Sequence, residues 1–505
     1  MSTNRRNFIK FVVVGSMAAG CPVDLSLLAA TPPAAVDGED NRICHQVRDG
    51  KVFEHPPASA RHDIVIVGGG MSGLTAAYLL RHRDFLLLEK EPHWGGNAYI
   101  MEYEGQAYAT GAAFLTKDER AYSFARQIGL EPLPINNWDG SIINGQFIPD
   151  TWGDGLDKLP YSAAVRESFK KFKKEMLAID VAQRSLELFG MPFSNFLKGY
   201  ADEVKLWWDT YGPSNWGAQS NETAAAVAIN ELQEMAADNR RDERYTWPGG
   251  LGAITRKLAE LLQASSAGHM QTGATIVAVV PGKSDVQITY TQGAELKTVT
   301  AKVVIMATPK FITRRIVDGI PEKQSDAMHD IHYIPYPVVN LIFDKPVFNK
   351  GYDTWCPGNT FTDFIVADWV VRNQPGYKQK YNILTCYTPM QEEDRGYLLT
   401  EPSTRKVAER VLSDFQKLFP GSNVDPIEVH IYRRGHPLFK STPGLYTRTQ
   451  PLVRRPMDRV FFANTDCEGP ESTTAGAMAA ARRAVHEAEA RLAGKPTPRQ
   501  EALAG

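Results

Sequence analysis

The feature that most constrains the fold of this chain is a glycine-rich turn between two short apolar runs. Residues 64–67 form an apolar run, residues 74–80 have the composition of a helix, and residues 85–88 form a second apolar run that ends at Glu89. This order predicts a strand, a tight turn, a helix and a second strand parallel to the first. The turn itself carries three glycines with the spacing GxGxxG.

Each glycine of this turn has its own role in the binding of a dinucleotide. Gly68 permits the tight turn, Gly70 lets the backbone approach a pyrophosphate, and Gly73 lets the helix pack closely on the strand. The N-terminus of the helix presents free N–H groups and a positive dipole end to the pyrophosphate. Glu89 follows Gly68 by 21 residues and is placed to accept hydrogen bonds from ribose hydroxyls. The residues expected at the dinucleotide are Gly68, Gly70, Met71, Ser72, Gly73, Glu89 and Lys90.

A second glycine pair, Gly95 and Gly96, follows the acidic residue and is succeeded by Asn97. A soluble nicotinamide enzyme has no obvious need for this pair. In the order GxGxxG, Glu, Gly-Gly, the chain resembles the flavin-containing amine oxidase and phytoene desaturase superfamily. The resemblance implies an FAD cofactor close to these three residues, although relatives usually carry Arg, near the FAD phosphates, where this chain has Asn97. No Ser-Gly-Gly-Cys-Tyr-like segment occurs, which implies that FAD is bound non-covalently.

Further segments extend the resemblance through the middle of the chain. Residues 108–113 resemble the small-residue turn that lies under the flavin in the family, and residues 247–251 resemble its Pro-x-Gly-Gly motif. Residues 303–309 read as a strand that ends in Ala-Thr-Pro, as in the family. In relatives the backbone at the position of Val277 meets the adenine, so Val277 is expected at the cofactor.

The C-terminal match is the most specific. Residues 459–466 read as a buried strand that ends on an acidic residue, and residues 473–483 read as a helix. Relatives end in the same way, with a helix whose N-terminus faces the flavin pyrimidine and whose dipole would stabilise negative charge there. The resemblance therefore places Asp466, Gly476 and Ala477 at the cofactor.

These matches imply an α/β fold, in which a Rossmann-type FAD-binding domain is discontinuous and is joined to a mixed α+β substrate domain. A length of 505 residues agrees with two or more domains. The expected division is 61–105, 246–310 and 455–495 for the FAD-binding domain, 106–245 and 311–454 for the substrate domain, 31–60 for a linker or surface arm, and 496–505 for a tail.

The N-terminus resembles a twin-arginine export signal. Arg5 and Arg6 precede an apolar run over residues 11–20, which is too short for a membrane span of roughly 20 apolar residues. The resemblance implies a signal peptide over residues 1–30, recognition by the twin-arginine export machinery and a periplasmic location. The small residues before Cys21 also resemble a lipoprotein cleavage box, so a lipid anchor at Cys21 stays an alternative.

Charge and cysteine content exclude several function classes. A net charge of −2 without long basic runs argues against nucleic acid as a partner. The five cysteines show no CxxC or Cys–His spacing, so no metal site is expected. One or two disulfides stay open in an oxidising compartment.

Aromatic residues are dense in the two insertions and predict an aromatic chamber, whose ring faces would hold a flat or cationic substrate at ~0.5–2 kcal/mol per cation contact. The candidates are Trp207, Trp208, Tyr211, Trp216, Trp355, Tyr387 and Tyr432. His436 stands where relatives often line this chamber. Asp363 and Asp368 either pair with an amine or lie on a solvated strand face. No catalytic base is assigned beyond the chamber candidates His436, Tyr432 and Trp355.

The strand expected over residues 338–343 bears on the electron acceptor. Amine oxidases that use oxygen often carry a lysine on the strand that this segment resembles, and this chain has Val338 or Pro337 at that place. A single gap in the alignment would instead bring Lys345 there. The missing lysine favours a dehydrogenase, with a quinone or a cytochrome as acceptor, over an oxidase.

The resulting expectation is an exported FAD-dependent oxidoreductase that oxidises an amine by hydride transfer to flavin N5. The substrate is a primary amine, a polyamine or an amino acid. Two alternatives stay open: a desaturase or isomerase of a polyene or other lipid, which would show a long apolar tunnel, and a non-catalytic flavoprotein with a closed chamber.

Changing Arg5 and Arg6 together to Lys should leave the protein in the cytoplasm with its flavin bound. The export receptor reads the arginine pair, and the pair contributes nothing to the fold. Cell fractionation combined with a flavin assay measures the distribution. Normal periplasmic recovery of the double variant would show that the segment is not a twin-arginine signal.

Overall fold

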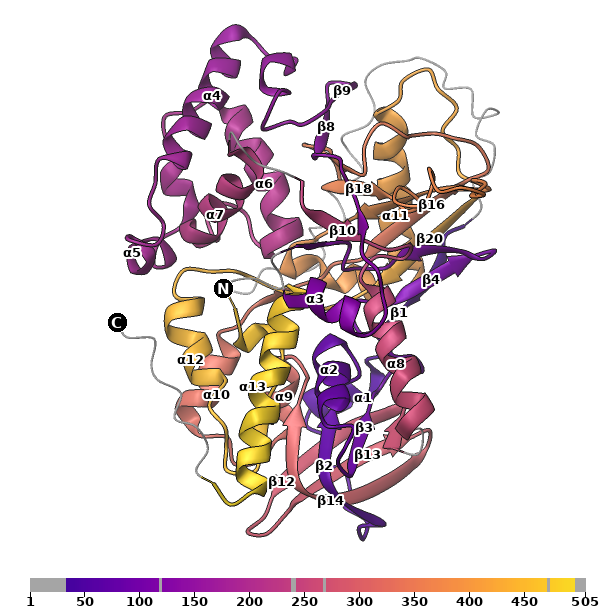
Figure 1. Cartoon of the computed structure of the whole chain (residues 1–505), viewed down its shortest axis with the longest axis vertical. Helices are drawn as coiled ribbons and strands as arrows, with labels where there is room; N and C mark the ends of the chain where they lie inside the picture. Colours follow the sequence, from indigo (N-terminus) through magenta and orange to yellow (C-terminus); the bar gives the residue numbers. More distant parts are fainter. Residues whose placement is uncertain (1–32, 118–119, 238–241, 267–268, 470–472, 496–505) are drawn as a thin grey trace, which may run out of the picture.

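The computed structural model describes residues 33–117, 120–237, 242–266, 269–469 and 473–495. The predicted export signal, Cys21 and the tail after residue 495 lie outside these residues. Two large sheets organise the chain, and Figure 1 shows them one above the other, with a group of helices beside the upper sheet.

The lower sheet is built from three separated segments of the chain. Its strands are β2 (Ala60–Val67), β3 (Phe85–Leu88), β11 (Met270–Gln271), β12 (Ala274–Pro281), β13 (Val286–Gln292), β14 (Glu295–Met306) and β22 (Val460–Phe462). Their order is β11-β3-β2-β14-β13-β12, with β22 paired to β14. β2, β3, β14 and β22 run parallel. All of β3 and the last four residues of β2 are buried, as expected for parallel strands that are covered on both faces.

The turn between β2 and α2 (Met71–Leu79) has the tight geometry predicted from its glycines. Gly68 has a φ of +106°, which residues with a side chain rarely adopt, and its N–H donates to Leu88 O at 2.8 Å. A Cβ on Gly73 would lie 1.7 Å from Gly68 O, so the first turn of α2 touches the backbone that precedes it. Figure 1 shows α2 beside α13 (Thr474–Leu492), its partner from the other end of the chain, and α8 (Gly252–Ser266) also contacts α2.

The upper sheet has eight strands in the order β1-β20-β16-β19-β18-β17-β8-β9. These are β1 (Ala35–Gly38), β8 (Gly140–Ile143), β9 (Gln146–Ile148), β16 (Val338–Phe343), β17 (Asp353–Trp355), β18 (Asp363–Val366), β19 (Asn382–Tyr387) and β20 (Glu428–Arg433). α11 (Glu401–Lys417) contacts β20, β16 and β1, and its buried face belongs to the same hydrophobic core as these strands.

The segment expected as a linker has secondary structure of its own. β1 pairs in parallel with β20, with Val36 opposite Ile431, and thereby becomes the edge strand of the upper sheet. It is followed by α1 (Arg42–Arg48), which contacts β12 of the lower sheet and α9 (Lys310–Ile316). The arm therefore touches both sheets.

The helices beside the upper sheet enclose an aromatic core. They are α4 (Ala163–Leu177), α5 (Ser185–Phe189), α6 (Asp202–Trp216) and α7 (Ala225–Ala236). Trp207 and Trp208 of α6 are buried here and contact Trp152, with ring centroids 5.1 and 5.4 Å away. Neither tryptophan lines the cavity described below, so both are core residues and not chamber residues.

Smaller elements complete the described chain. They are the strands β4 (Ile100–Tyr103), β5 (Gln106–Ala109), β6 (Leu115–Thr116), β7 (Leu133–Pro134), β10 (Arg244–Thr246), β15 (Tyr333–Ile334) and β21 (Leu438–Phe439), and the helices α3 (Arg120–Gln127), α10 (Glu322–His329) and α12 (Gln450–Val453). No helix among the described residues combines the length and the apolar character that a membrane span requires. The four described cysteines, Cys44, Cys356, Cys386 and Cys467, are free thiols.

Two glycines of the turn should respond differently to the same substitution. Gly73→Ala should lower the free energy of unfolding by about 3 kcal/mol, because its Cβ would meet backbone that cannot move. Gly70→Ala should fold normally, since the nearest atom to its Cβ, Gly96 Cα, is 3.7 Å away. The new methyl group would nevertheless occupy the surface expected to receive the cofactor pyrophosphate, so flavin retention should fall.

Thermal melts of the apoproteins and the ratio of flavin to protein after gel filtration separate the two effects. A Gly70→Ala protein that keeps a full complement of flavin would contradict the placement of the pyrophosphate at this turn.

Candidate functional site

A cavity of about 1090 Å³ is lined by residues of both sheets. One part of its wall is the glycine turn with the residues after β3, and another part comes from the upper sheet and α6. Sequence-predicted residues on this wall are Gly68, Gly70, Met71, Ser72, Glu89, Lys90, Gly95, Gly96, Asn97, Ala477, Trp355, Tyr432 and His436. Gly73, Val277, Asp466 and Gly476 are not on it.

Glu89 shapes the turn through its carboxylate. Its Oε2 accepts from Gly69 N at 2.5 Å, and its Oε1 accepts from Glu91 N at 2.8 Å. Burial raises the pKa of Glu89, although nearby Lys90 and the two N–H groups act in the opposite direction. Since a carboxylate can accept about four hydrogen bonds, these two contacts leave capacity for ribose hydroxyls.

Lys90 belongs to a charged group beside the turn. Its Nζ is in ion-pair contact with Glu91, which in turn accepts from Asp40 N in the N-terminal arm. Burial alone would lower the pKa of Lys90, but Glu39 and Glu91 outweigh that effect and raise it. The arm is thus tied electrostatically to the segment that follows β3.

Two predicted cofactor residues near the adenine and flavin ends lie just off the cavity wall. The register of β12 against β13 shifts between Ile276 and Ala278, and Thr275 and Ile276 line the cavity in place of Val277. The Gly476 N–H donates to the hydroxyl of Thr473, which caps α13, and Thr473 itself lines the cavity. At a β-bulge and at a helix cap, the residues that line the cavity are thus one to three positions away from the predicted cofactor residues.

Asp466, which is predicted at the cofactor, does not line the cavity and is held by buried partners within the protein. Its Oδ1 accepts from Lys310 Nζ at 2.7 Å, and its Oδ2 accepts from Lys310 N at 2.8 Å and from Tyr333 OH at 2.6 Å. Both members of this ion pair are completely buried. Its neighbours Asn464 and Thr465 line the cavity instead.

The far part of the cavity is both aromatic and acidic. Five carboxylate residues line it, namely Asp139, Glu231, Glu234, Asp353 and Asp363, together with the rings of Tyr211, Trp216, Tyr336, Trp355 and Tyr387. Tyr211 and Trp355 lie with ring centroids 4.3 Å apart. Of these acidic residues the sequence had indicated only Asp363. The other candidate, Asp368, is held by Arg372 and Tyr377 away from the cavity.

Asp353 and Asp363 lie on adjacent strands, β17 and β18, and are both buried. Asp363 Oδ1 accepts from Ser214 Oγ at 2.9 Å and Thr362 Oγ1 at 2.6 Å, whereas Asp353 Oδ1 has no hydrogen-bond partner among the described residues. Burial raises the pKa of Asp363 to about 7, and burial together with Asp139 and Asp363 raises the pKa of Asp353 well above its usual range. Neither carboxyl group forms an ion pair with a cation among the described residues.

The positive charge nearest to these acids is already committed. Arg244 forms ion pairs with Asp139 and Asp242, and the indole of Trp355 donates to Asp139 at 3.2 Å. Asp353 and Asp363 therefore offer a buried acceptor site to a cation that enters from the cavity.

The chamber candidates from the sequence fall into different neighbourhoods. Trp355 lies with the acids, whereas Tyr432 OH lies 3.2 Å from His93 Nε2 beside the arm. His436 packs against Phe311 with ring centroids 4.4 Å apart, and burial lowers its pKa to about 4. A neutral His436 near pH 7 cannot pair with an anion.

Val338 and Lys345 lie at different places relative to the cavity. β16 begins at Val338, which lines the cavity, while Lys345 lies beyond the end of this strand on the surface and donates to Asn423 at 3.0 Å. Among the described residues, Lys90 is the lysine on the cavity wall, and it is paired with Glu91. The gap that would bring Lys345 to the cavity is therefore ruled out.

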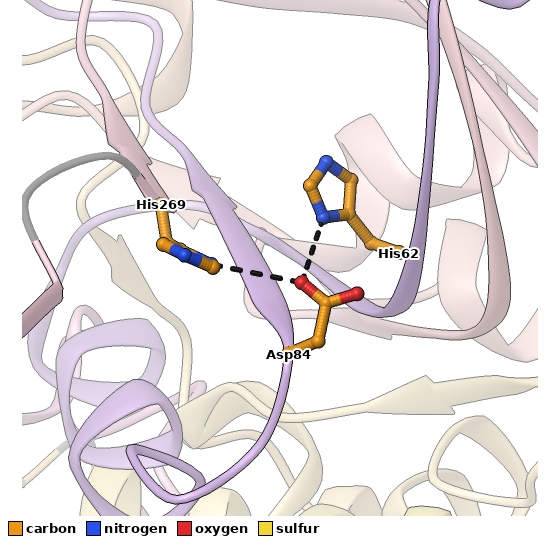
Figure 2. Close-up of side chains that lie close together, drawn as sticks. All are labelled: His62, Asp84 and His269. Carbon is orange, nitrogen blue, oxygen red and sulfur yellow. Dashed lines mark hydrogen bonds and ion pairs between the residues drawn. The ribbon is translucent and has the colours of Figure 1, made fainter.

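Figure 2 shows a cluster of His62, Asp84 and His269. These residues lie near the starts of β2, β3 and β11, whereas the glycine turn follows the end of β2. His62 Nδ1 is 3.0 Å from Asp84 Oδ1, and His269 Nδ1 is 3.6 Å from the same oxygen but 2.7 Å from Phe85 O. Both of these nitrogens are thus already hydrogen-bonded within the protein. The cluster joins β2, β3 and β11, does not line the cavity, and is not assigned a metal.

The residues at the turn fit FAD. α2 begins after Gly70 without a side-chain cap, so the N–H groups of its first turn are open to a phosphate. The glycines on the wall expose their backbone atoms at this place. Glu89 lies beside them, and its carboxylate oxygens can still accept hydrogen bonds. The cavity continues past the turn into the acidic part, which leaves room for a second molecule next to the cofactor.

Comparisons with known proteins agree with this geometry. The family model described as flavin containing amine oxidoreductase matches residues 71–488. Oxidoreductase PigB of Serratia sp. is 22% identical over 503 residues, covering 82% of this chain and 73% of that protein, and the chloroplastic protoporphyrinogen oxidase 1 of Spinacia oleracea is 24% identical over 323 residues, covering 56% of each. The solved structure of putrescine oxidase bound to putrescine has a TM-score of 0.64 at 16% identity, covering 84% of this chain and 98% of that one. Since the matched segment takes in most of the chain, the protein belongs to the flavin-containing amine oxidoreductase family and is an FAD-dependent oxidoreductase.

Proposed function

We propose that the substrate is an amine that enters the cavity as an ammonium ion. The observation that carries this proposal is the buried pair Asp353 and Asp363, which lines the cavity without a positive partner of its own. An ammonium group between the two would supply that charge, and the rings of Trp355 and Tyr387 could flank its alkyl part.

In this scheme the protein orients the substrate and controls its protons. FAD, when bound, supplies the acceptor for a hydride equivalent at N5. Asp363 anchors the ammonium end, and Ser214 and Thr362 fix the carboxylate by donating to it. Binding of a cation favours the ionised form of both acids, so the pair releases a proton as the substrate enters. The nitrogen beside the C–H bond that breaks must be neutral when the hydride leaves, so its proton passes to solvent beforehand, and no ionised base from the chain is required.

The carboxylates on the cavity wall disfavour the other substrates and the non-catalytic role. A polyene or other lipid would desolvate the carboxylates without providing a counter-charge, which is costly. An amino acid would bring its own carboxylate to a site that already holds several. A non-catalytic role would not explain why the cavity extends beyond the glycine turn into an acidic part. Monoamines, diamines and polyamines fit best, in line with the putrescine bound to the similar oxidase.

The proposal includes export and an acceptor other than oxygen. The support for export is the Arg5 and Arg6 motif of the sequence, which would place the enzyme in the periplasm, whether or not Cys21 carries a lipid. The support for a quinone or cytochrome acceptor is that Val338 or Pro337 stands where the resemblance places the lysine that oxygen-using relatives often carry.

Anaerobic mixing of the purified yellow protein with a panel of amines tests the reaction. Monoamines, diamines or polyamines should remove the flavin colour, and amino acids should do so far more slowly. Admission of air should restore the colour slowly, and a soluble quinone should restore it quickly. No bleaching by any amine would refute the amine proposal, and reoxidation by oxygen at the rate of turnover would refute the dehydrogenase.

The pH dependence should report the state of Asp363. Below its pKa of about 7 the group is neutral and cannot pair with an ammonium ion, so kcat/KM should rise with pH through about 7. Asp363→Asn removes one partner of a buried charge pair, a change that costs about 2 kcal/mol or more and corresponds to about a 30-fold loss in kcat/KM at pH 8. The rise near pH 7 should also be lost.

Asp368→Asn is the matched control, because Asp368 is equally buried and lies on the same segment but does not line the cavity. Its pH profile should match that of the wild type. An unchanged profile in Asp363→Asn would place the ammonium elsewhere.

A further inference from the structure

Arg434 is a buried cation on the wall of the cofactor cavity. It follows β20, and only 2% of its surface is exposed. Its guanidinium donates to Gly96 O at 3.1 Å, to Thr110 Oγ1 at 3.0 Å and to Thr110 O, and it stacks on the ring of Tyr432 with Cζ 4.2 Å from the centroid. Every one of these partners is electrically neutral.

No carboxylate among the described residues forms an ion pair with Arg434. Glu39 and Glu91 act on it only at longer range, and burial lowers its pKa in spite of them. A buried charge without a close counter-charge costs several kcal/mol, so such groups are normally paired. The counter-charge of Arg434 must therefore come from what occupies the cavity.

The cofactor offers such a charge close by. Arg434 bonds to Gly96, and a Cβ on Gly96 would lie 3.0 Å from Gly70 Cα in the turn. Asn97 cannot supply charge, and its side-chain amide donates to Pro437 O at 2.7 Å. The other arginines on the wall, Arg48, Arg315 and Arg395, come from different elements, and none of them is bonded to the glycine pair.

We propose that Arg434 is the cationic ligand of the FAD diphosphate in this protein. It reaches the glycine pair from the upper sheet, so the two sheets are joined through the cofactor. The guanidinium is already fixed by the carbonyl oxygens of Gly96 and Thr110 and by Tyr432, which limits the entropy that it loses on binding.

Arg434→Met tests this assignment by removing the charge while keeping an apolar chain of similar length. Reconstitution of the apoprotein should show FAD binding weakened by about 30-fold or more, as for loss of one partner of a buried charge pair. Riboflavin, which has the same ring system but no phosphate, should bind within about threefold of wild type. Equal losses for FAD and riboflavin, or a shifted flavin midpoint potential with normal FAD affinity, would place the guanidinium at the flavin ring and overturn the proposal.

Two further variants separate loss of charge from loss of structure. Adding Asn97→Arg to Arg434→Met should restore a large part of the FAD affinity, because it returns a cation to the same side of the glycine pair. Arg256→Met, which removes an exposed arginine paired with Glu102 outside the cavity, should leave FAD affinity unchanged. Unchanged FAD affinity in Arg434→Met would contradict the assignment.

A measurement on the wild type covers the case in which Arg434→Met does not fold. Millimolar inorganic pyrophosphate should raise the melting temperature of the wild-type apoprotein, because it supplies the counter-charge that the guanidinium lacks. Failure of pyrophosphate to stabilise the apoprotein would overturn the proposal.

Discussion

The rest of the structure depends on the contact between the first turn of α2 and the backbone of the turn that precedes it. Gly73 has no side chain, so α2 can lie directly against Gly68, and the positive φ of Gly68 directs the chain from β2 into the helix. This contact sets where the helix N-terminus and Glu89 meet. It also fixes the depth at which α13, from the other end of the chain, can pack beside α2. The shape of the cofactor end of the cavity therefore follows from this contact.

The second part of the cavity follows a different physical rule. Two of its acids, Asp353 and Asp363, are buried on β17 and β18 of the upper sheet, where a side chain cannot turn away to water. Ordinary structural acids in such places acquire an internal cation, as Asp466 does with Lys310 and as Asp139 does with Arg244. Asp353 and Asp363 do not, so the pKa values of both groups are raised, and a cationic ligand can replace the protons that they hold. At the cofactor end the unmatched charge has the opposite sign, because Arg434 is a buried cation without a close counter-anion. One cavity thus has two ends with opposite requirements.

The sequence predicted the parts of the fold that local pattern controls. The glycine turn, β3 with its acidic end, the strand from Val338 and the C-terminal helix follow from apolar periodicity and turn chemistry, and the FAD-dependent family was identified correctly from them. The predicted cofactor residues that do not line the cavity depend on details that no local pattern records. A β-bulge places Thr275 and Ile276 on the wall beside Val277, and a buried lysine 156 residues away in the sequence engages Asp466. Arg434 and Asp353 were missed because each looks like an ordinary charge beside an apolar run. Only the tertiary fold shows that neither has a close counter-charge.

The N-terminal arm supplies one wall of the cavity. Glu39, Cys44 and His45 line the cavity, and the arm is held at the edge of the upper sheet by β1, by the bond from Glu39 N to Arg433 O and by the bond from Arg405 to Ala34 O. Opening this wall by local unfolding would separate β1 from β20 and would expose Val36 and Val47, which pack against the two cores. The order of assembly then matters: a large dinucleotide enters most easily while the arm is open, and the docked arm afterwards slows its escape. The docked arm would thus act as a latch on the bound cofactor.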